Sequence, residues 1–165
     1  MGKPQPFVWI VFPVVGDCWF DARGFWQRRG ILRLRHCAID TFGVRGVQLL
    51  GGVFGTVTDK GESPKGGYWI RYSGPHGYVI YRAHMDAPSP LPIGAPVTPL
   101  TVVGTLGRSG NARTTRCHDH CQVKLGRAFV DHGPALLAAF HRDGKVMVAS
   151  RCTKDPGHCT CQAAP

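Results

Sequence analysis

The sequence contains a single glutamate, Glu62, which lies in a polar, turn-like stretch just before Pro64. Helical zinc proteases with the His-Glu-x-x-His motif use glutamate as their general base, so the sequence excludes that class. Any acid–base chemistry must therefore fall mainly to the 8 histidines or to the aspartates.

The sequence also lacks a long apolar run and a clear export signal. Residues 7–15 are apolar, but Pro13 interrupts them, only Lys3 precedes them, and no small-residue cleavage site follows. No apolar run approaches the roughly 20 residues that span a bilayer. We therefore expect no membrane span and recognise no signal peptide.

Helical patterning is scarce, whereas turn residues are abundant. The 165 residues include 22 glycines and 13 prolines, and 43% are hydrophobic. This balance is typical of one domain built from short strands and many turns. Only residues 134–141 resemble a helix, with proline in the first turn. The sequence predicts a mainly β, single domain of antiparallel sheets. The strands are predicted at residues 47–58 (one or two strands), 68–72, 78–85, 101–106 and 117–125.

Three groups of histidines are candidates for chemistry. His36 precedes Asp40 by four positions, His84 ends a β-like run, and His118 and His120 are two residues apart. Residues two apart in a strand point to the same face, so His118 and His120 can converge on one point. Catalytic zinc uses three protein ligands plus water, and two imidazoles with one carboxylate fit that count. Each group alone is also compatible with a surface pair or a hydrogen-bonded structural histidine.

The order and surroundings of these groups point to a family. Residues 36–40 have the spacing His-x-x-x-Asp, residues 81–85 place histidine after Tyr-x-x, and residues 117–123 contain His-x-His. In this order they resemble the motifs of the lysostaphin-type (LytM-like) zinc endopeptidases, which cut peptide bonds in bacterial peptidoglycan. The resemblance covers residues 12–126. It also includes the family's first strand and its spaced glycines at residues 12–16, 52–57, 93–97 and 103–110.

The resemblance implies an antiparallel β domain with a substrate groove and one zinc ion per chain. It assigns His36, Asp40 and His120 as the zinc ligands, and His84 and His118 as the catalytic pair beside the metal. Which histidine acts as base and which stabilises the oxyanion stays open. The implied function is a zinc metallo-endopeptidase that hydrolyses peptide bonds in cell-wall peptidoglycan. Which bond is cut depends on loops around the groove.

The sequence departs from the family pattern next to these positions. Ala38 replaces a glycine between the first two ligands, Asp119 replaces an apolar residue, and Cys121 and Gln122 replace phenylalanine and glutamate. None of these changes removes a ligand or a catalytic histidine. Because His84 is present, an active enzyme is favoured over the alternative, a non-catalytic cell-wall-binding or virion structural module of the same fold.

Seven cysteines are many for this size, and an odd number cannot all pair within one chain. On a strand, Cys117 and Cys121 would lie roughly 13 Å apart, beyond the disulfide limit of about 7 Å. Cys121 is expected to be a small buried hydrophobe on the face opposite His118 and His120. Cys37 is expected to point away from the metal if its segment is extended. A disulfide or disorder is favoured over a metal site for the tail residues Cys152, His158, Cys159 and Cys161.

The excess of basic over acidic residues gives a net charge of +10 at pH 7. Nucleic acid is one partner for such a charge, but the sequence contains no helix-turn-helix, zinc-finger spacing or RNA-binding motif. An anionic cell wall suits it better, because the wall is the substrate of the similar family. We expect peptidoglycan peptides and anionic wall polymers as partners, and no nucleic acid.

Three segments are predicted along the chain. Residues 1–35 form an aromatic and basic segment packed on the domain, residues 36–126 form the metallopeptidase core, and residues 127–165 contain a short helix and a cysteine-containing tail. The expected place of action is extracellular, at the cell wall. A bacteriophage lysin or a virion-associated lytic enzyme fits the small size, and an exported bacterial hydrolase is the other interpretation.

Overall fold

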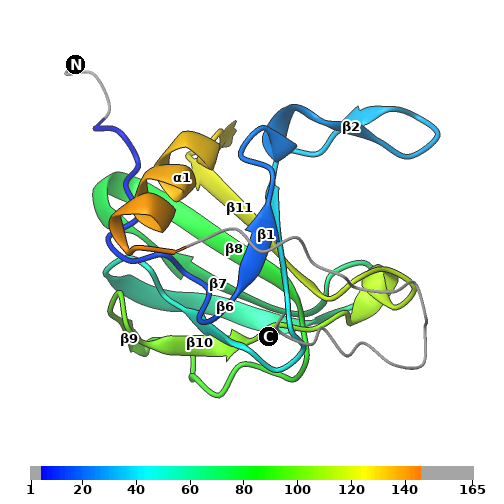
Figure 1. Cartoon of the computed structure of the whole chain (residues 1–165). Helices are drawn as coiled ribbons and strands as arrows, with labels where there is room; N and C mark the ends of the chain where they lie inside the picture. The colour runs from blue at the N-terminus through cyan, green and yellow to red at the C-terminus, as the bar shows by residue number, and fades with distance from the viewer. Residues whose placement is uncertain (1–4, 146–165) are drawn as a thin grey trace.

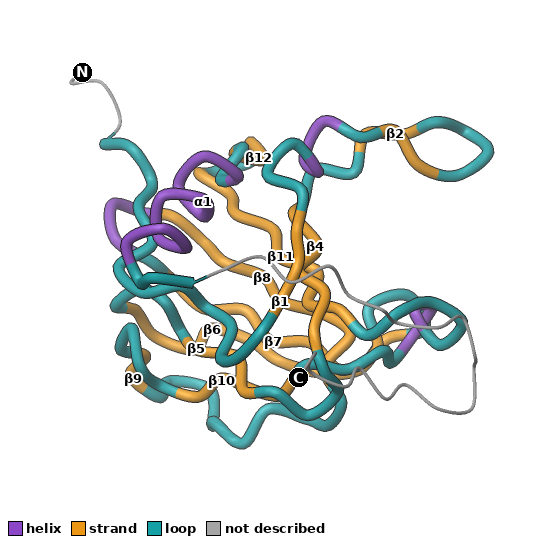
Figure 2. The backbone as a smooth tube through the Cα atoms, in the orientation of Figure 1, coloured by secondary structure: helices purple, strands orange, loops and turns teal. Residues whose placement is uncertain are grey.

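Antiparallel strands are the main regular element of the computed structural model, which describes residues 5–145 (Figure 1 and Figure 2). The tail cysteines and His158 lie outside the described residues. One α-helix, α1 (Gly133–Arg142), occurs in this range, and no helix there is long and apolar enough to cross a membrane. The strands are β1 (Cys18–Phe20), β2 (Arg28–Arg29), β3 (Leu34–Arg35), β4 (Ile39–Gly43), β5 (Gln48–Leu50), β6 (Gly55–Ser63), β7 (Gly67–Ser73), β8 (Tyr78–Met85), β9 (Pro96–Val97), β10 (Val102–Thr105), β11 (His118–Leu125) and β12 (Ala128–Val130).

One large sheet runs in the order β1-β4-β11-β8-β7-β6-β9, with β12 paired to β11. Two smaller ladders, β10-β5 and β2-β3, lie outside it. All of these pairings are antiparallel, so the prediction of antiparallel sheets is confirmed. The register places His120 of β11 opposite Asp40 of β4 on one side and opposite Ala83 of β8 on the other.

Most of the predicted elements are present, but the expected turn around Glu62 is wrong, and the extended segment on which the Cys37 expectation depended is absent. The strands predicted at residues 68–72 and 78–85 are β7 and β8, which pair with each other, and α1 lies where the helix was expected. The stretch around Glu62 is not a turn, because β6 continues to Ser63 and Glu62 pairs with Tyr68 of β7. Cys37 is not in an extended segment, since its φ is +55°, and β4 begins only at Ile39.

The chain before β1 supplies a large part of the aromatic core. Trp9 and Phe12 are buried, and the Phe12 ring lies 5.1 Å from the ring of Phe140 in α1. The Arg142 side chain of α1 donates hydrogen bonds to the carbonyls of Trp9 and Ile10, at 2.9 and 2.7 Å. The helix and this N-terminal chain therefore pack together beside the sheet, as Figure 1 shows.

A buried ion pair joins β8 to β11. The guanidinium of Arg82 donates to both carboxylate oxygens of Asp119 at 2.6–3.1 Å, and both side chains are fully buried. Two further hydrogens are donated to the carbonyls of Leu50, at 2.6 Å, and Pro13, at 3.2 Å. Burial alone would lower the pKa of Arg82, but the adjacent Asp119 raises it above its ordinary value. Asp119 stands where the family pattern has an apolar residue, and its buried charge is balanced by Arg82.

Cys121 follows the strand alternation. It is buried and carries a free thiol, so it forms no disulfide with Cys117. Burial raises the pKa of this thiol well above its ordinary value, because a thiolate is poorly solvated there. The prediction that Cys121 is a small buried hydrophobe is confirmed.

We predict that Asp119→Ala lowers the free energy of unfolding by about 3–5 kcal/mol, because it leaves the Arg82 guanidinium buried without its counter-charge. Urea denaturation followed by circular dichroism measures the loss. Asp59→Ala is the matched control, since the Arg71–Asp59 pair is exposed and should contribute less than about 1 kcal/mol. Equal losses in the two variants would contradict the prediction. The double variant Arg82→Met/Asp119→Leu should regain much of the stability.

Candidate metal centre and active site

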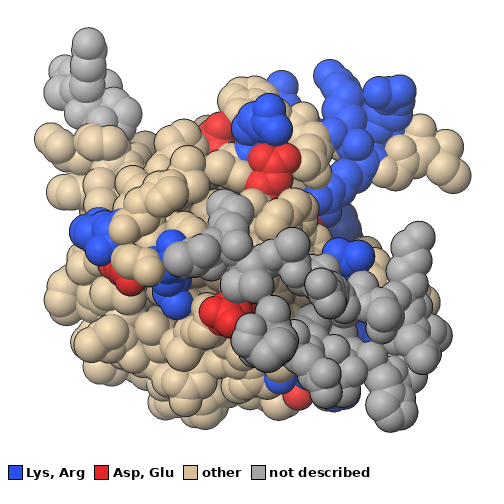
Figure 3. All heavy atoms as spheres, viewed as in Figure 1, with Lys and Arg blue, Asp and Glu red and all other residues tan. Residues whose placement is uncertain are grey.

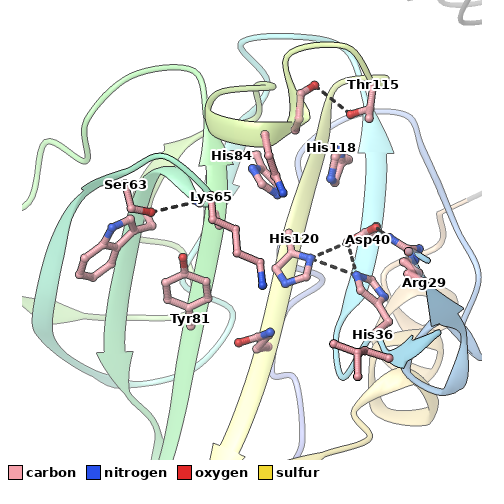
Figure 4. A pocket seen from close by; sticks show the side chains of 18 of the residues that line it. Arg29, His36, Asp40, Ser63, Lys65, Tyr81, His84, Thr115, His118 and His120 are labelled. Carbon is pink, nitrogen blue, oxygen red and sulfur yellow. Dashed lines mark hydrogen bonds and ion pairs between the residues drawn. The ribbon is translucent and has the colours of Figure 1, made fainter. Parts of the chain in front are cut away.

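Three donor atoms converge on one point in a surface groove (Figure 4). Asp40 Oδ1 lies 3.2 Å from His36 Nε2 and 2.9 Å from His120 Nδ1, and the two nitrogens are 3.1 Å apart. With bonds of about 2.0–2.1 Å, a tetrahedral zinc ion separates its ligand atoms by roughly 3.3–3.4 Å. The donor set and its spacing therefore fit zinc after a small adjustment.

A backbone contact orients His36, and strand pairing places His120. His36 Nδ1 lies 3.2 Å from the carbonyl of Gly24, and because a carbonyl only accepts, Nδ1 carries a proton and Nε2 is the nitrogen turned toward Asp40. His120 approaches Asp40 through the β4–β11 register and presents Nδ1 instead. Fixing the tautomer in this way is the usual role of the groups around a metal ligand.

Asp40 is the one carboxylate in the trio, and its side chain is almost fully buried. Burial would raise its pKa, but hydrogen bonds from His120 and His36 outweigh this and lower the pKa well below its ordinary value. The second oxygen, Oδ2, accepts a hydrogen bond from Nη1 of Arg29, which comes from β2. Asp40 is therefore ionised, as a zinc ligand must be.

Two further histidines stand beside the trio. The ring centroid of His84 lies 4.9 Å from that of His118 and 5.6 Å from that of His120. Nδ1 of His84 donates to the Ser109 carbonyl at 3.0 Å, and Nδ1 of His118 donates to the Arg116 carbonyl at 2.8 Å. Burial lowers the pKa of both rings, to about 4 for His84. Both are thus neutral at pH 7, with Nε2 able to accept a proton.

The backbone of His84 is held in an uncommon conformation, with φ at +62°. Its N–H donates to the Gly66 carbonyl at 2.8 Å, and its carbonyl accepts from the Ser109 N–H at 3.4 Å. The segments that contain Gly66 and Ser109 meet at Gly67 and Gly110, where an added Cβ would collide with backbone atoms. A left-handed residue other than glycine costs about 1–3 kcal/mol and is typical of functional sites.

The groove around these residues has a volume of about 910 Å³. Trp69 and Tyr81 contribute aromatic walls, and Tyr81 lies in register with Gln122 of β11. Among the described residues that line the groove, Asp40 is the single acidic side chain. Apart from the histidines, the other ionisable side chains with a charge at pH 7 are all basic. These are Arg29, Arg35, Lys65, Arg71 and Lys124. The groove therefore favours anionic ligands.

The structure brings all of the sequence-predicted site residues together: His36, Asp40, His84, His118 and His120. Sequence reasoning missed Arg29 and the basic residues along the groove. The density of arginines before His36 was a signal in the sequence that could have pointed to Arg29. Nothing in the sequence predicts that β2 reaches back to Asp40.

No protein-family model matches the sequence, and no curated protein matches it significantly. Solved structures do match. The catalytic domain of the antimicrobial peptidase lysostaphin from Staphylococcus simulans is 22% identical with a TM-score of 0.62, over 69% of this chain and 89% of that one. A variant of the catalytic domain of the prophage-encoded protein EnpA from Enterococcus faecalis is 21% identical with a TM-score of 0.57, over 78% and 95%.

A zinc-containing peptidase from Vibrio cholerae is 18% identical, with a TM-score of 0.58 over 71% of this chain. The match covers only 34% of that longer chain, so this chain spans about a third of it. The predicted mainly β domain with a groove is present. The chain therefore has the fold of the lysostaphin-type peptidases.

Proposed function

We propose that the chain is a zinc metallo-endopeptidase that hydrolyses peptide bonds in bacterial cell-wall peptidoglycan. The observation that carries this proposal is the convergence of the His36, Asp40 and His120 donors beside two neutral histidines in a groove. A fold by itself supports many functions, so the argument rests on these side chains. The similar structures that are described as peptidases or catalytic domains support the same function.

Zinc held by the trio would supply a Lewis acid and lower the pKa of water to about 7. Around it, this chain provides the proton transfers. The neutral Nε2 atoms of His84 and His118 can accept the proton of the attacking water, and the protonated rings can donate to the leaving amine or to the developing oxyanion. The backbone carbonyl partners on Nδ1 keep each ring in the tautomer that this requires.

The proposed substrate and place of action follow from the charge of the groove. Five basic residues line it, and a peptide that carries free carboxylates or an anionic wall polymer would be attracted to them. We propose action at the cell wall, outside the cell, by a bacteriophage lysin or a virion-associated enzyme. The likeness to the prophage-encoded EnpA domain supports a phage source.

We predict that the purified protein carries about one zinc ion. It should clear purified cell walls in a zymogram and lose this activity when a chelator removes the metal. His36→Ala and Asp40→Ala should each lose zinc and activity together. His76→Ala is the matched control, because His76 is exposed on the turn before β8 and should keep both. Full zinc content in either ligand variant, measured by mass spectrometry, would contradict the assignment.

We predict that His84→Ala and His118→Ala retain zinc but lose hydrolysis by about 100-fold or more, the usual contribution of acid–base catalysis. The measurements are turnover on soluble wall fragments and zinc content of the same preparations. Activity like that of the unmodified protein in either variant would show that the role is assigned to the wrong residue. Zinc binding with no turnover in the unmodified protein would instead support the non-catalytic wall-binding module.

We predict that Lys65→Gln/Lys124→Gln weakens binding to purified walls several-fold and makes binding less sensitive to salt. Exposed charges are screened within about 10 Å at 0.1 M salt, so each lost charge removes part of that sensitivity. Arg113→Gln/Arg127→Gln is the control with the same loss of charge, because both residues are exposed and neither lines the groove. Pull-down on insoluble walls at several salt concentrations checks both. Equal losses in the two variants would mean that total charge, and not the groove, is recognised.

A further inference from the structure

A two-stranded hairpin projects from the body of the protein (Figure 1), and some of its residues line the groove. It is formed by β2 and β3, in which Arg28 pairs with Arg35 and Arg29 with Leu34. Its base is anchored by the contact of Arg29 with Asp40, and its turn by a hydrogen bond from Arg28 to the Arg33 carbonyl at 3.2 Å. The hairpin is thus an ordered element that presents its tip to the surroundings.

The tip of this hairpin is apolar. Ile31 is 101% exposed, Leu32 is 80% exposed and Leu34 is 65% exposed. Scattered exposed apolar residues are ordinary, but three on one projecting turn make a patch, and patches of this kind mark interaction sites. Trp26, at the base of the hairpin, is also exposed and carries the Arg35 guanidinium 4.6 Å from its ring centre.

The flanks of the tip are exclusively basic. Between Asp21 and Asp40 the sequence contains no acidic residue. Figure 3 shows the Lys and Arg side chains gathered along the hairpin, with an uncharged end beyond them. The arginines of the hairpin are Arg28, Arg29, Arg33 and Arg35. A partner that covers this element must therefore be anionic and must also offer apolar surface.

We propose that the hairpin docks the protein onto a membrane surface that contains anionic phospholipid. Ile31 and Leu32 enter the boundary between headgroups and acyl chains, while the arginines contact lipid phosphates. A wall polymer or a nucleic acid would satisfy the arginines but would leave the apolar tip in water. Because Arg29, Gly30 and Leu34 also line the groove, docking places the groove close to the membrane face. The proposal does not require that the groove be catalytic.

Vesicle flotation of the full chain tests the proposal. We expect binding to vesicles of phosphatidylglycerol mixed with phosphatidylcholine, no binding to phosphatidylcholine alone, and release at high salt because the attraction is screened. Ile31→Ser/Leu32→Ser should weaken binding to the anionic vesicles by about tenfold or more, since apolar burial contributes to interfacial binding. Arg33→Gln should weaken it by a smaller factor. Hydrolysis of isolated walls by the serine variant should be unchanged.

The matched control is Ile93→Ser/Leu100→Ser, because these side chains are comparably exposed, at 61% and 68%, in a different part of the surface. It should bind anionic vesicles as the unmodified protein does. Absence of binding by the unmodified protein would overturn the proposal, as would equal losses in the control and tip variants. Undiminished binding by the tip variant would also overturn it, because it would show that the arginines bind an anionic surface without insertion of the apolar tip.

Discussion

The buried pair between Arg82 and Asp119 is the constraint on which the site depends. An isolated charge inside a protein is strongly destabilising, so either residue is tolerated only because the other is present. Asp119 separates His118 from His120 on β11, and its burial on the interior face directs both histidines to the groove face. The same guanidinium reaches carbonyls of β5 and of the N-terminal chain. One buried cation thereby connects the strands behind the site.

The hydrophobic pattern of the sequence predicted those strands in which one face is buried and the other faces solvent. Parts of β7, β8 and β11 alternate in this way, such as residues 70–73, 78–82 and 119–122, and glycine or proline lies near the ends of these strands. The pattern could not predict the second half of β6, where Lys60 to Ser63 are polar on both faces. Backbone pairing with β7 holds that segment in the sheet, and such pairing is not visible in side-chain hydrophobicity.

The candidate site was predictable only in part for a related reason. Strand alternation suffices to put His118 and His120 on one face, whereas placing Asp40 opposite His120 requires the register of β4 against β11. The family resemblance supplied that pairing, because the spacing of the residues does not contain it. Arg29 escaped prediction because its contact with Asp40 depends on how a short, exposed hairpin folds back. Long-range geometry of this kind has no local signature.

Arg29 links two features that otherwise look separate. Its guanidinium is partly exposed, but its partner Asp40 is nearly fully buried, so the contact is screened less than an ordinary surface pair. The basic hairpin therefore stands on the same carboxylate that would hold the metal. Asp40 has one oxygen for the two histidines and one for Arg29, which leaves its orientation little freedom. A partner that binds the hairpin tip therefore contacts the same hairpin whose base, through Arg29, holds the candidate metal ligand Asp40.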